Sequence, residues 1–255
     1  MSGLRARSSI HAKYILRLVV RVIVAVVAVC LYICDRADFA VIKGAGFFYR
    51  FSVLHLLWLM WLMDMILQLV PARRYMALGS QKQFARYERA VDPAPPADAL
   101  REFIRGANRG AAKVLALWLG VVLVLGILYF TGILGAEELL LCAAFFYVCD
   151  LICVLVWCPF RALLMKNRCC TTCRIFNWDH LMMFSPLVFV PGVYTYSLVA
   201  IAAAVFLLWE VQFHRHPERF WARSNGALQC AQCTDKLCPV RIGAPRRREH
   251  TAAIK

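Results

Sequence analysis

Seven of the twelve cysteines fall in two short tracts, one over residues 158–173 and the other over residues 230–238. Each tract contains a C-x-x-C unit. The turn between two such cysteines puts both sulfurs within reach of one metal ion or cluster, and two units supply four ligands. The spacing therefore predicts a metal–thiolate site. Its predicted ligands are Cys170, Cys173, Cys230 and Cys233, with Cys158, Cys169 and Cys238 in reserve.

Four thiolates suit either an iron–sulfur cluster or Zn²⁺. Proline follows Cys158 and Cys238, as it often follows a cluster-ligating cysteine, and this favours an iron–sulfur cluster over zinc. A metal-free dithiol at the first C-x-x-C unit is a third reading. Asp179 and His180 follow the first tract and would either orient the ligands or cap the next helical segment.

Two carboxylates, Asp64 and Asp150, lie inside long apolar runs. A carboxylate in a membrane is costly and normally faces the bundle interior or a wet cavity. Their distances from the ends of their runs place the two carboxylates at similar depth in the membrane. They would form either a proton or cation site or two unrelated polar groups. Cys142, Cys149 and Cys153 share one helix face, where small polarizable side chains are expected to pack.

The composition decides what kind of element positions these groups. Hydrophobic residues make up 62% of the 255 residues, charged residues only 18%, and the mean hydropathy is +0.62. A soluble domain with this composition would expose large apolar patches. The fold class predicted is therefore an all-α integral membrane protein, a polytopic helical bundle.

About six membrane segments are expected, since a spanning helix needs about 20 apolar residues. The fifth would be short, kinked near Pro186 or re-entrant, and the Pro191-Gly192 turn would separate it from the sixth. The predicted segments are residues 18–34, 47–70, 112–134, 139–158, 175–190 and 193–213.

Charge predicts the orientation. The net charge of +15 is concentrated in the N-terminal segment, two connections and the C-terminal segment. Positive loops stay in the cytoplasm, so both termini are expected there, in what would be a bacterial inner membrane. Contacts of these loops with anionic lipid explain the excess of positive charge, so no nucleic-acid partner is predicted. Residues 175–213 must then form a hairpin, which returns the second thiol tract to the face of the first.

The chain accordingly divides into membrane and cytoplasmic parts. Between the second and third spans, two cytoplasmic helices are expected to form a hairpin, broken at the prolines of residues 93–96. The predicted parts are a cytoplasmic N-terminus (1–17), segments 1–2 (18–70), a helical loop (71–111), segments 3–4 (112–158), a Cys-rich loop (159–174), a membrane hairpin (175–213) and a Cys-rich basic tail (214–255).

Taken together, these features predict a membrane redox module that passes electrons between a cytosolic donor and a membrane partner or quinone. Three alternatives remain open: a zinc-stapled interaction protein, a thiol–disulfide oxidoreductase, and a small transporter built on Asp64 and Asp150. The lipid bilayer is the one partner that the composition itself requires. The sequence assigns neither a substrate nor an enzymatic reaction.

Overall fold

The computed structural model describes residues 2–71, 76–167 and 169–233, and within these ranges the chain is helical without strands. The longer elements are α1 (Ser2–Cys34), α3 (Leu54–Leu69), α5 (Ala97–Phe130), α6 (Ala136–Leu155) and α8 (Val193–Arg215). Short helices join them: η1 (Arg36–Ile42), α2 (Gly46–Tyr49), α4 (Leu78–Gln81), η2 (Ala85–Tyr87), η3 (Phe160–Leu164), η4 (Phe176–Trp178), α7 (Asp179–Phe184), η5 (Ser185–Phe189), η6 (Pro217–Phe220), η7 (Gly226–Leu228) and η8 (Cys230–Gln232).

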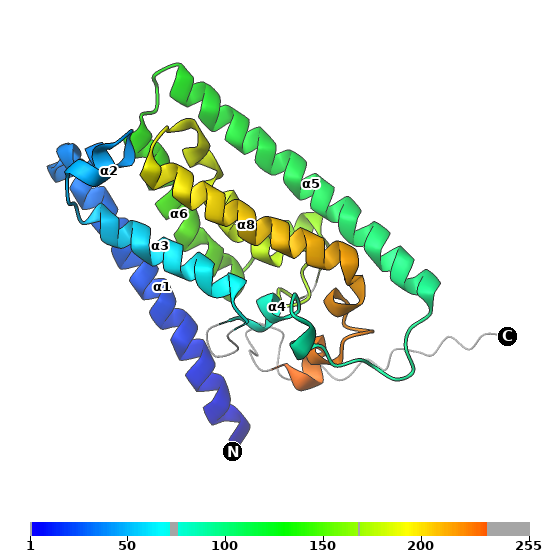
Figure 1. Ribbon diagram of the computed structural model, residues 1–255. Helices are drawn as coiled ribbons and strands as arrows, with labels where there is room; N and C mark the ends of the chain where they lie inside the picture. Colours follow the sequence, from blue (N-terminus) through cyan, green and yellow to red (C-terminus); the bar gives the residue numbers. More distant parts are fainter. Residues whose placement is uncertain (1, 72–75, 168, 234–255) are drawn as a thin grey trace.

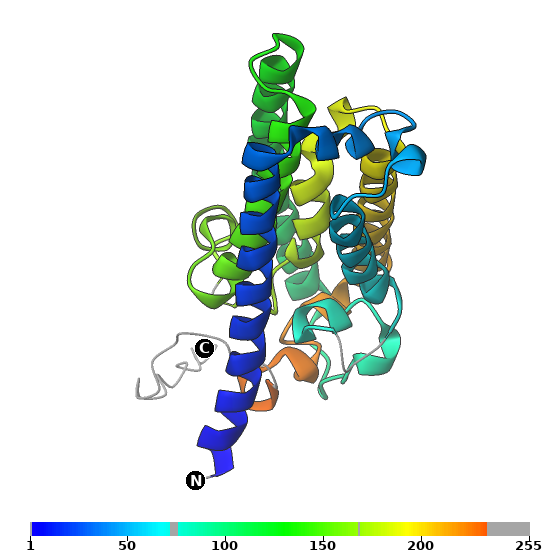
Figure 2. The ribbon, with the colours of Figure 1, turned by 90° about the vertical axis from the view of Figure 1, so that its left-hand side faces the viewer.

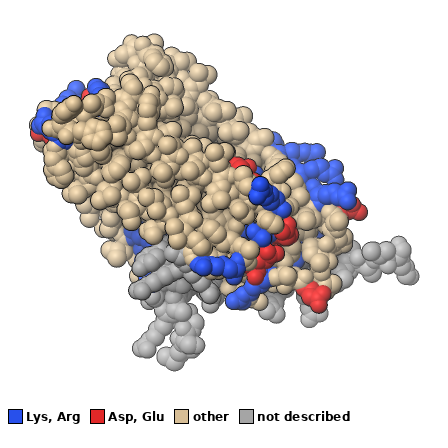
Figure 3. Space-filling view, in the orientation of Figure 1, with Lys and Arg blue, Asp and Glu red and all other residues tan. Residues whose placement is uncertain are grey.

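Four helices of the described chain are long and apolar enough to cross a bilayer: residues 12–34 of α1, and the whole of α5, α6 and α8. Figure 3 shows the same property on the surface, where a broad uncharged face separates charged groups gathered at the ends. The helical membrane class predicted from composition is therefore confirmed. The six segments go beyond these four helices and stay a prediction.

The predicted second span, residues 47–70, is divided in two. Helix α2 ends at Tyr49 and α3 begins at Leu54, where the Ser52 hydroxyl accepts a hydrogen bond from the Leu54 amide at 3.2 Å. The 16 residues of α3 extend about 24 Å, which is less than the ~30 Å hydrocarbon core. Residues 176–189 are broken more strongly, into η4, α7 and η5.

The expected helical hairpin over residues 71–111 is wrong in its first arm. Residues 76–91 hold only α4 and η2, joined by extended backbone. The second arm does form, as the first turns of α5, which continues from Ala97 without a break into the apolar run. Long-range contacts explain the difference, because side chains of residues 76–91 bond to loops elsewhere rather than to a helical neighbour.

Two apolar clusters hold the bundle together. The larger surrounds Trp61, Phe184 and Tyr194, where α3, α6, α7 and α8 meet; the smaller surrounds Trp209 and Phe220. Helix α1 packs along α6, and α3 packs along α8 (Figure 1).

The connections gather at the two ends of the bundle. In Figures 1 and 2, η1, α2 and the α5–α6 connection lie at one end, while α4 and η6 to η8 lie at the other, where α1 begins. At the first end the Gly44 amide donates to the Pro191 carbonyl at 2.8 Å. A Cβ on Gly192 would lie 2.3 Å from the Ile42 carbonyl oxygen, so this approach requires glycine.

Candidate functional site

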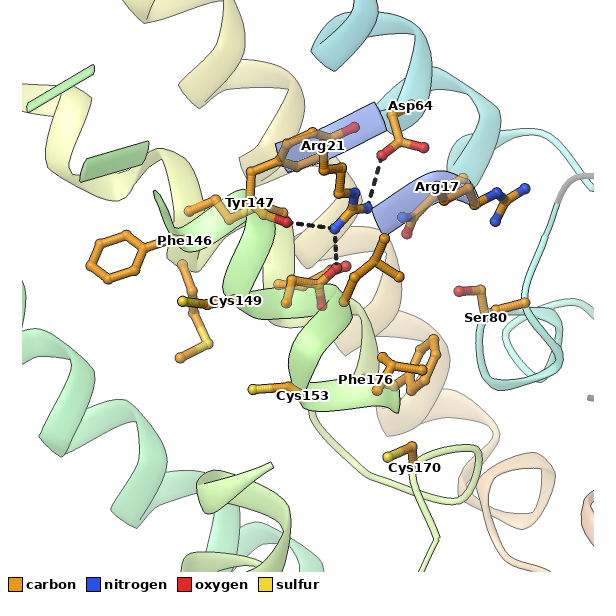
Figure 4. Close-up of a pocket in the computed structure, with 18 of the residues that line it drawn as sticks. Arg17, Arg21, Asp64, Ser80, Phe146, Tyr147, Cys149, Cys153, Cys170 and Phe176 are labelled. Carbon is orange, nitrogen blue, oxygen red and sulfur yellow. Dashed lines mark hydrogen bonds and ion pairs between the residues drawn. The ribbon is translucent and has the colours of Figure 1, made fainter. Parts of the chain in front are cut away.

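Arg21 of α1 joins the two intramembrane carboxylates. Its guanidinium donates to Asp150 Oδ2 at 2.6 Å and to the Tyr147 carbonyl at 2.7 Å, and it lies 3.5 Å from Asp64 Oδ2. The Arg21 side chain is 11% exposed, and it also lies over the Tyr147 ring (Figure 4). Asp64 and Asp150 therefore meet at one cation. The sequence analysis placed Arg21 at the boundary of its span and did not predict this role. The position of Arg21 inside the apolar run 18–34 could have indicated that its side chain needs a partner within the membrane.

His180 extends this group toward the first thiol tract. His180 Nε2 lies 3.6 Å from Asp64 Oδ2, and its Nδ1 lies 3.1 Å from Asp179 Oδ1 and 3.2 Å from Gln68 Nε2. The structure thus places Asp179 and His180 against the aspartate of α3. We call Arg21, Asp64, Asp150, Asp179 and His180 the charged network. Its opposite charges alternate, which offsets the cost of burying them.

The first C-x-x-C unit forms a turn that is held from two sides. The Cys173 amide donates to the Cys170 carbonyl at 2.9 Å. Lys82, fully buried, donates from Nζ to the carbonyls of Thr171 and Cys173 at 2.8 and 2.7 Å. On the other side Arg174 forms a two-pronged ion pair with Glu210 of α8. We call residues 170–174 the thiol loop.

Burial sets the ionisation of this loop. It raises the pKa of the Cys170 thiol to about 12 and also raises the pKa of the Cys173 thiol. Burial likewise lowers the pKa of the Lys82 ammonium to about 7, against the opposing influence of the nearby Cys173. Both thiols of the unit therefore favour the protonated state.

A second pair of thiols lies at the end of α6. Cys153 of α6 and Cys158 just beyond its end line the same cavity, and Cys158 Sγ accepts a hydrogen bond from the Arg161 amide at 3.4 Å. The neighbouring Cys153 thiol is the main reason that the pKa of Cys158 is lowered to about 6. Cys158 was predicted only as a reserve ligand, and Cys153 only as a packing residue. Their spacing, across the end of a helix, matches no ligand motif.

These groups share one cavity of about 600 Å³, which we call the thiol-lined pocket. Its wall carries Arg21, Asp64, Asp150 and Asp179 of the charged network, together with apolar side chains of α1, α3 and α6 (Figure 4). Its cysteines are Cys149, Cys153, Cys158, Cys170 and Cys173. The sulfur groups and the intramembrane charges, which the sequence suggested separately, therefore face a common space.

The predicted metal ligands are only partly described. Cys230 is exposed, Cys233 is partly buried, and Cys238 lies outside the described residues. Within the described ranges, no group of three or more His, Cys, Asp or Glu side chains is arranged to hold a metal ion. The four-cysteine site stays a prediction.

The segment with Cys230 and Cys233 is nevertheless tied to the same end of the molecule. Residues 76–91 bridge the two tracts: Lys82 bonds to the thiol loop, while the Val91 amide donates to the Ser224 carbonyl at 3.1 Å. The Gly226 amide donates in return to the Arg89 carbonyl at 2.7 Å.

Comparison of the chain with protein-family models, with curated proteins and with solved structures gives no match.

Proposed function

We propose that the chain is an integral membrane redox protein in which Cys153 and Cys158 form a dithiol–disulfide couple. The observation that carries the proposal is that both cysteines, five residues apart across the end of α6, line the wall of the thiol-lined pocket, where each thiol influences the ionisation of the other. Two cysteines on one pocket wall can form a disulfide if their Cα and Cβ atoms come within the required geometry. The lowered pKa of Cys158 supplies the thiolate that thiol–disulfide chemistry requires.

The electron and proton balance fits the surroundings. Oxidising two thiols to a disulfide releases two electrons and two protons. Asp150 lies on the same helix as Cys153, one turn away, and within electrostatic reach of it. The charged network therefore offers carboxylates beside the couple, and Arg21 keeps their charge balanced during the reaction.

The test starts from protein purified anaerobically in detergent. We expect the couple to cycle with a two-electron midpoint potential and a mass change of about 2 Da, and both signals should vanish in Cys153→Ser and Cys158→Ser. Cys142→Ser, on the same helix but off the pocket wall, is the matched control and should behave like the unmodified protein. Thiols that stay reduced across the accessible potential range would refute the couple.

A metal–thiolate redox site is the second candidate. It is favoured by the electrostatic influence of Cys158, Cys169 and Cys173 on the Cys170 thiol, while the described residues alone do not form a group of three metal ligands. Cys230 and Cys233 would complete the ligands of an iron–sulfur cluster. Stoichiometric iron with broad visible absorption, lost in Cys170→Ser and Cys233→Ser, would establish it. Colourless protein with bound zinc would instead support a zinc-stapled interaction protein, because Zn²⁺ is redox-silent.

A further inference from the structure

We propose that the thiol-lined pocket takes a lipid-soluble quinone directly from the bilayer. The inference rests on the proposed function, for which it names the electron acceptor. The cavity volume of about 600 Å³ is in the range that holds a ring with part of an apolar tail.

The mouth of the pocket opens between helices that face lipid. Leu16 and Val20 of α1 and Met63 of α3 line the cavity, yet they are 64%, 43% and 47% exposed on the outside of the bundle. Helix α1 packs along α6 and α3 along α8, so α1 and α3 flank the opening. Because these side chains line the pocket and also face the membrane, the pocket opens sideways toward lipid. An apolar molecule can enter through such an opening without passing through water.

Inside, the wall suits a flat ring with polar oxygens. Trp118, Phe146 and Phe176 offer aromatic surfaces for offset or edge contacts with a ring. Gln68 lines the cavity, and its side-chain oxygen Oε1 is buried with no hydrogen-bond donor among the described residues. A buried acceptor of this kind normally has a partner, and the hydroxyl group of a hydroquinone would supply the donor.

The redox step balances with this acceptor. Cys153–SH and Cys158–SH lose two electrons and two protons and become joined by an S–S bond. The quinone gains the same two electrons and two protons, one proton on each oxygen, and leaves as the hydroquinone. No further oxidant or metal takes part, and the product is still lipid-soluble.

Binding is measured separately from redox, in the Cys153→Ser/Cys158→Ser double variant. The probe is the hydroquinone form of a short-chain ubiquinone analogue, kept reduced by anaerobic handling, titrated into this variant in detergent and followed by calorimetry. We expect saturable binding of one molecule. Gln68→Leu should weaken it by about tenfold, the effect of one hydrogen bond. Met63→Trp, which fills the mouth, should abolish it.

The controls separate the pocket from the lipid-facing surface. Leu123→Trp places the same indole on an exposed face of α5 away from the pocket and should leave the affinity unchanged. Circular dichroism melting identifies any variant that fails to fold, and Gln68→Glu, which keeps an acceptor, should retain binding.

Three outcomes would overturn the inference: no saturable binding, equal binding in Met63→Trp and Leu123→Trp, or a tightly held phospholipid that the quinone analogue does not displace in native mass spectrometry. If thiols cycle with a soluble disulfide while the analogue fails to bind, the proposed function stands and the acceptor is wrong. If the analogue binds the double variant while the native thiols never oxidise, the site stands and the proposed function is wrong.

Discussion

Arg21 balances two carboxylates that come from different helices, Asp64 of α3 and Asp150 of α6. Removing it would leave two negative charges next to each other within the bundle. We expect Arg21→Met to lower the stability by about 3–5 kcal/mol, as for other broken buried pairs. Thermal unfolding in detergent measures the loss, and Arg101→Gln, at an exposed position of α5, is the control.

Partial recovery in Arg21→Met/Asp150→Asn would tie the loss to uncompensated charge, because the second substitution removes one of the two anions. If the double variant is no more stable than the single one, lost packing against the Tyr147 ring explains the effect instead.

The two thiol environments predict different alkylation profiles. With a pKa of about 6, Cys158 is largely thiolate at pH 7, so its rate of reaction with iodoacetamide should change little between pH 7 and 9. Cys170, with a pKa of about 12, stays protonated there, and its rate should rise about tenfold for each pH unit. Peptide mass spectrometry resolves the two sites. Parallel profiles would show that the thiols share one environment.

At the level of single residues, the sequence singles out unusual groups but does not specify what they contact. An aspartate in an apolar run is conspicuous, so Asp64 and Asp150 were found. Their partner was not, because an arginine close to a span end looks like an ordinary boundary residue. That Cys153 and Cys158 share a pocket wall depends on how α6 ends at Leu155, which no spacing rule specifies.

Among the elements, the segment of residues 76–91 is bonded to two distant parts of the chain, residues 171–177 and 224–226. Lys82 fixes the thiol loop, and the Ser80 hydroxyl donates to Asn177 Oδ1 at 2.7 Å. A polar stretch with spaced apolar residues predicted a helix here, but these side-chain bonds favour short turns with extended backbone between them. Helix α5 was predicted more closely, since its amphipathic beginning and apolar continuation are both local properties of the sequence.

Lys82→Met tests the role of this segment. The substitution removes the nitrogen that lies over the Trp209 and Phe220 rings, and it leaves the carbonyls of Thr171 and Cys173 without their donor. We expect a loss of about 1–3 kcal/mol and faster labelling of Cys173, which becomes accessible when the loop opens. Lys113→Met, at an exposed site on α5, serves as the control. Unchanged protection of Cys173 would mean that the Arg174–Glu210 pair is enough to hold the loop.

For the whole molecule, the hydrogen bonds between residues 89–91 and 224–226 place these two segments on the same side of any membrane. Reporter fusions within residues 80–95 and after residue 225 should therefore agree. The excess of Lys and Arg predicts that both report the cytoplasm. If the two fusions report opposite sides, the pairing of residues 89–91 with residues 224–226 is wrong. If both report the external side, only the predicted orientation is wrong.

The order of synthesis adds a consequence of the charged network. Arg21 emerges from the ribosome 43 residues before Asp64 and 129 residues before Asp150. Only 6% of the most apolar window of α1 is buried within the bundle, so most of the surface of this helix faces outward. Until α3 is made, Arg21 has neither of its two carboxylate partners. The ion pairs that hold Arg21 are therefore complete only once α6 has been made.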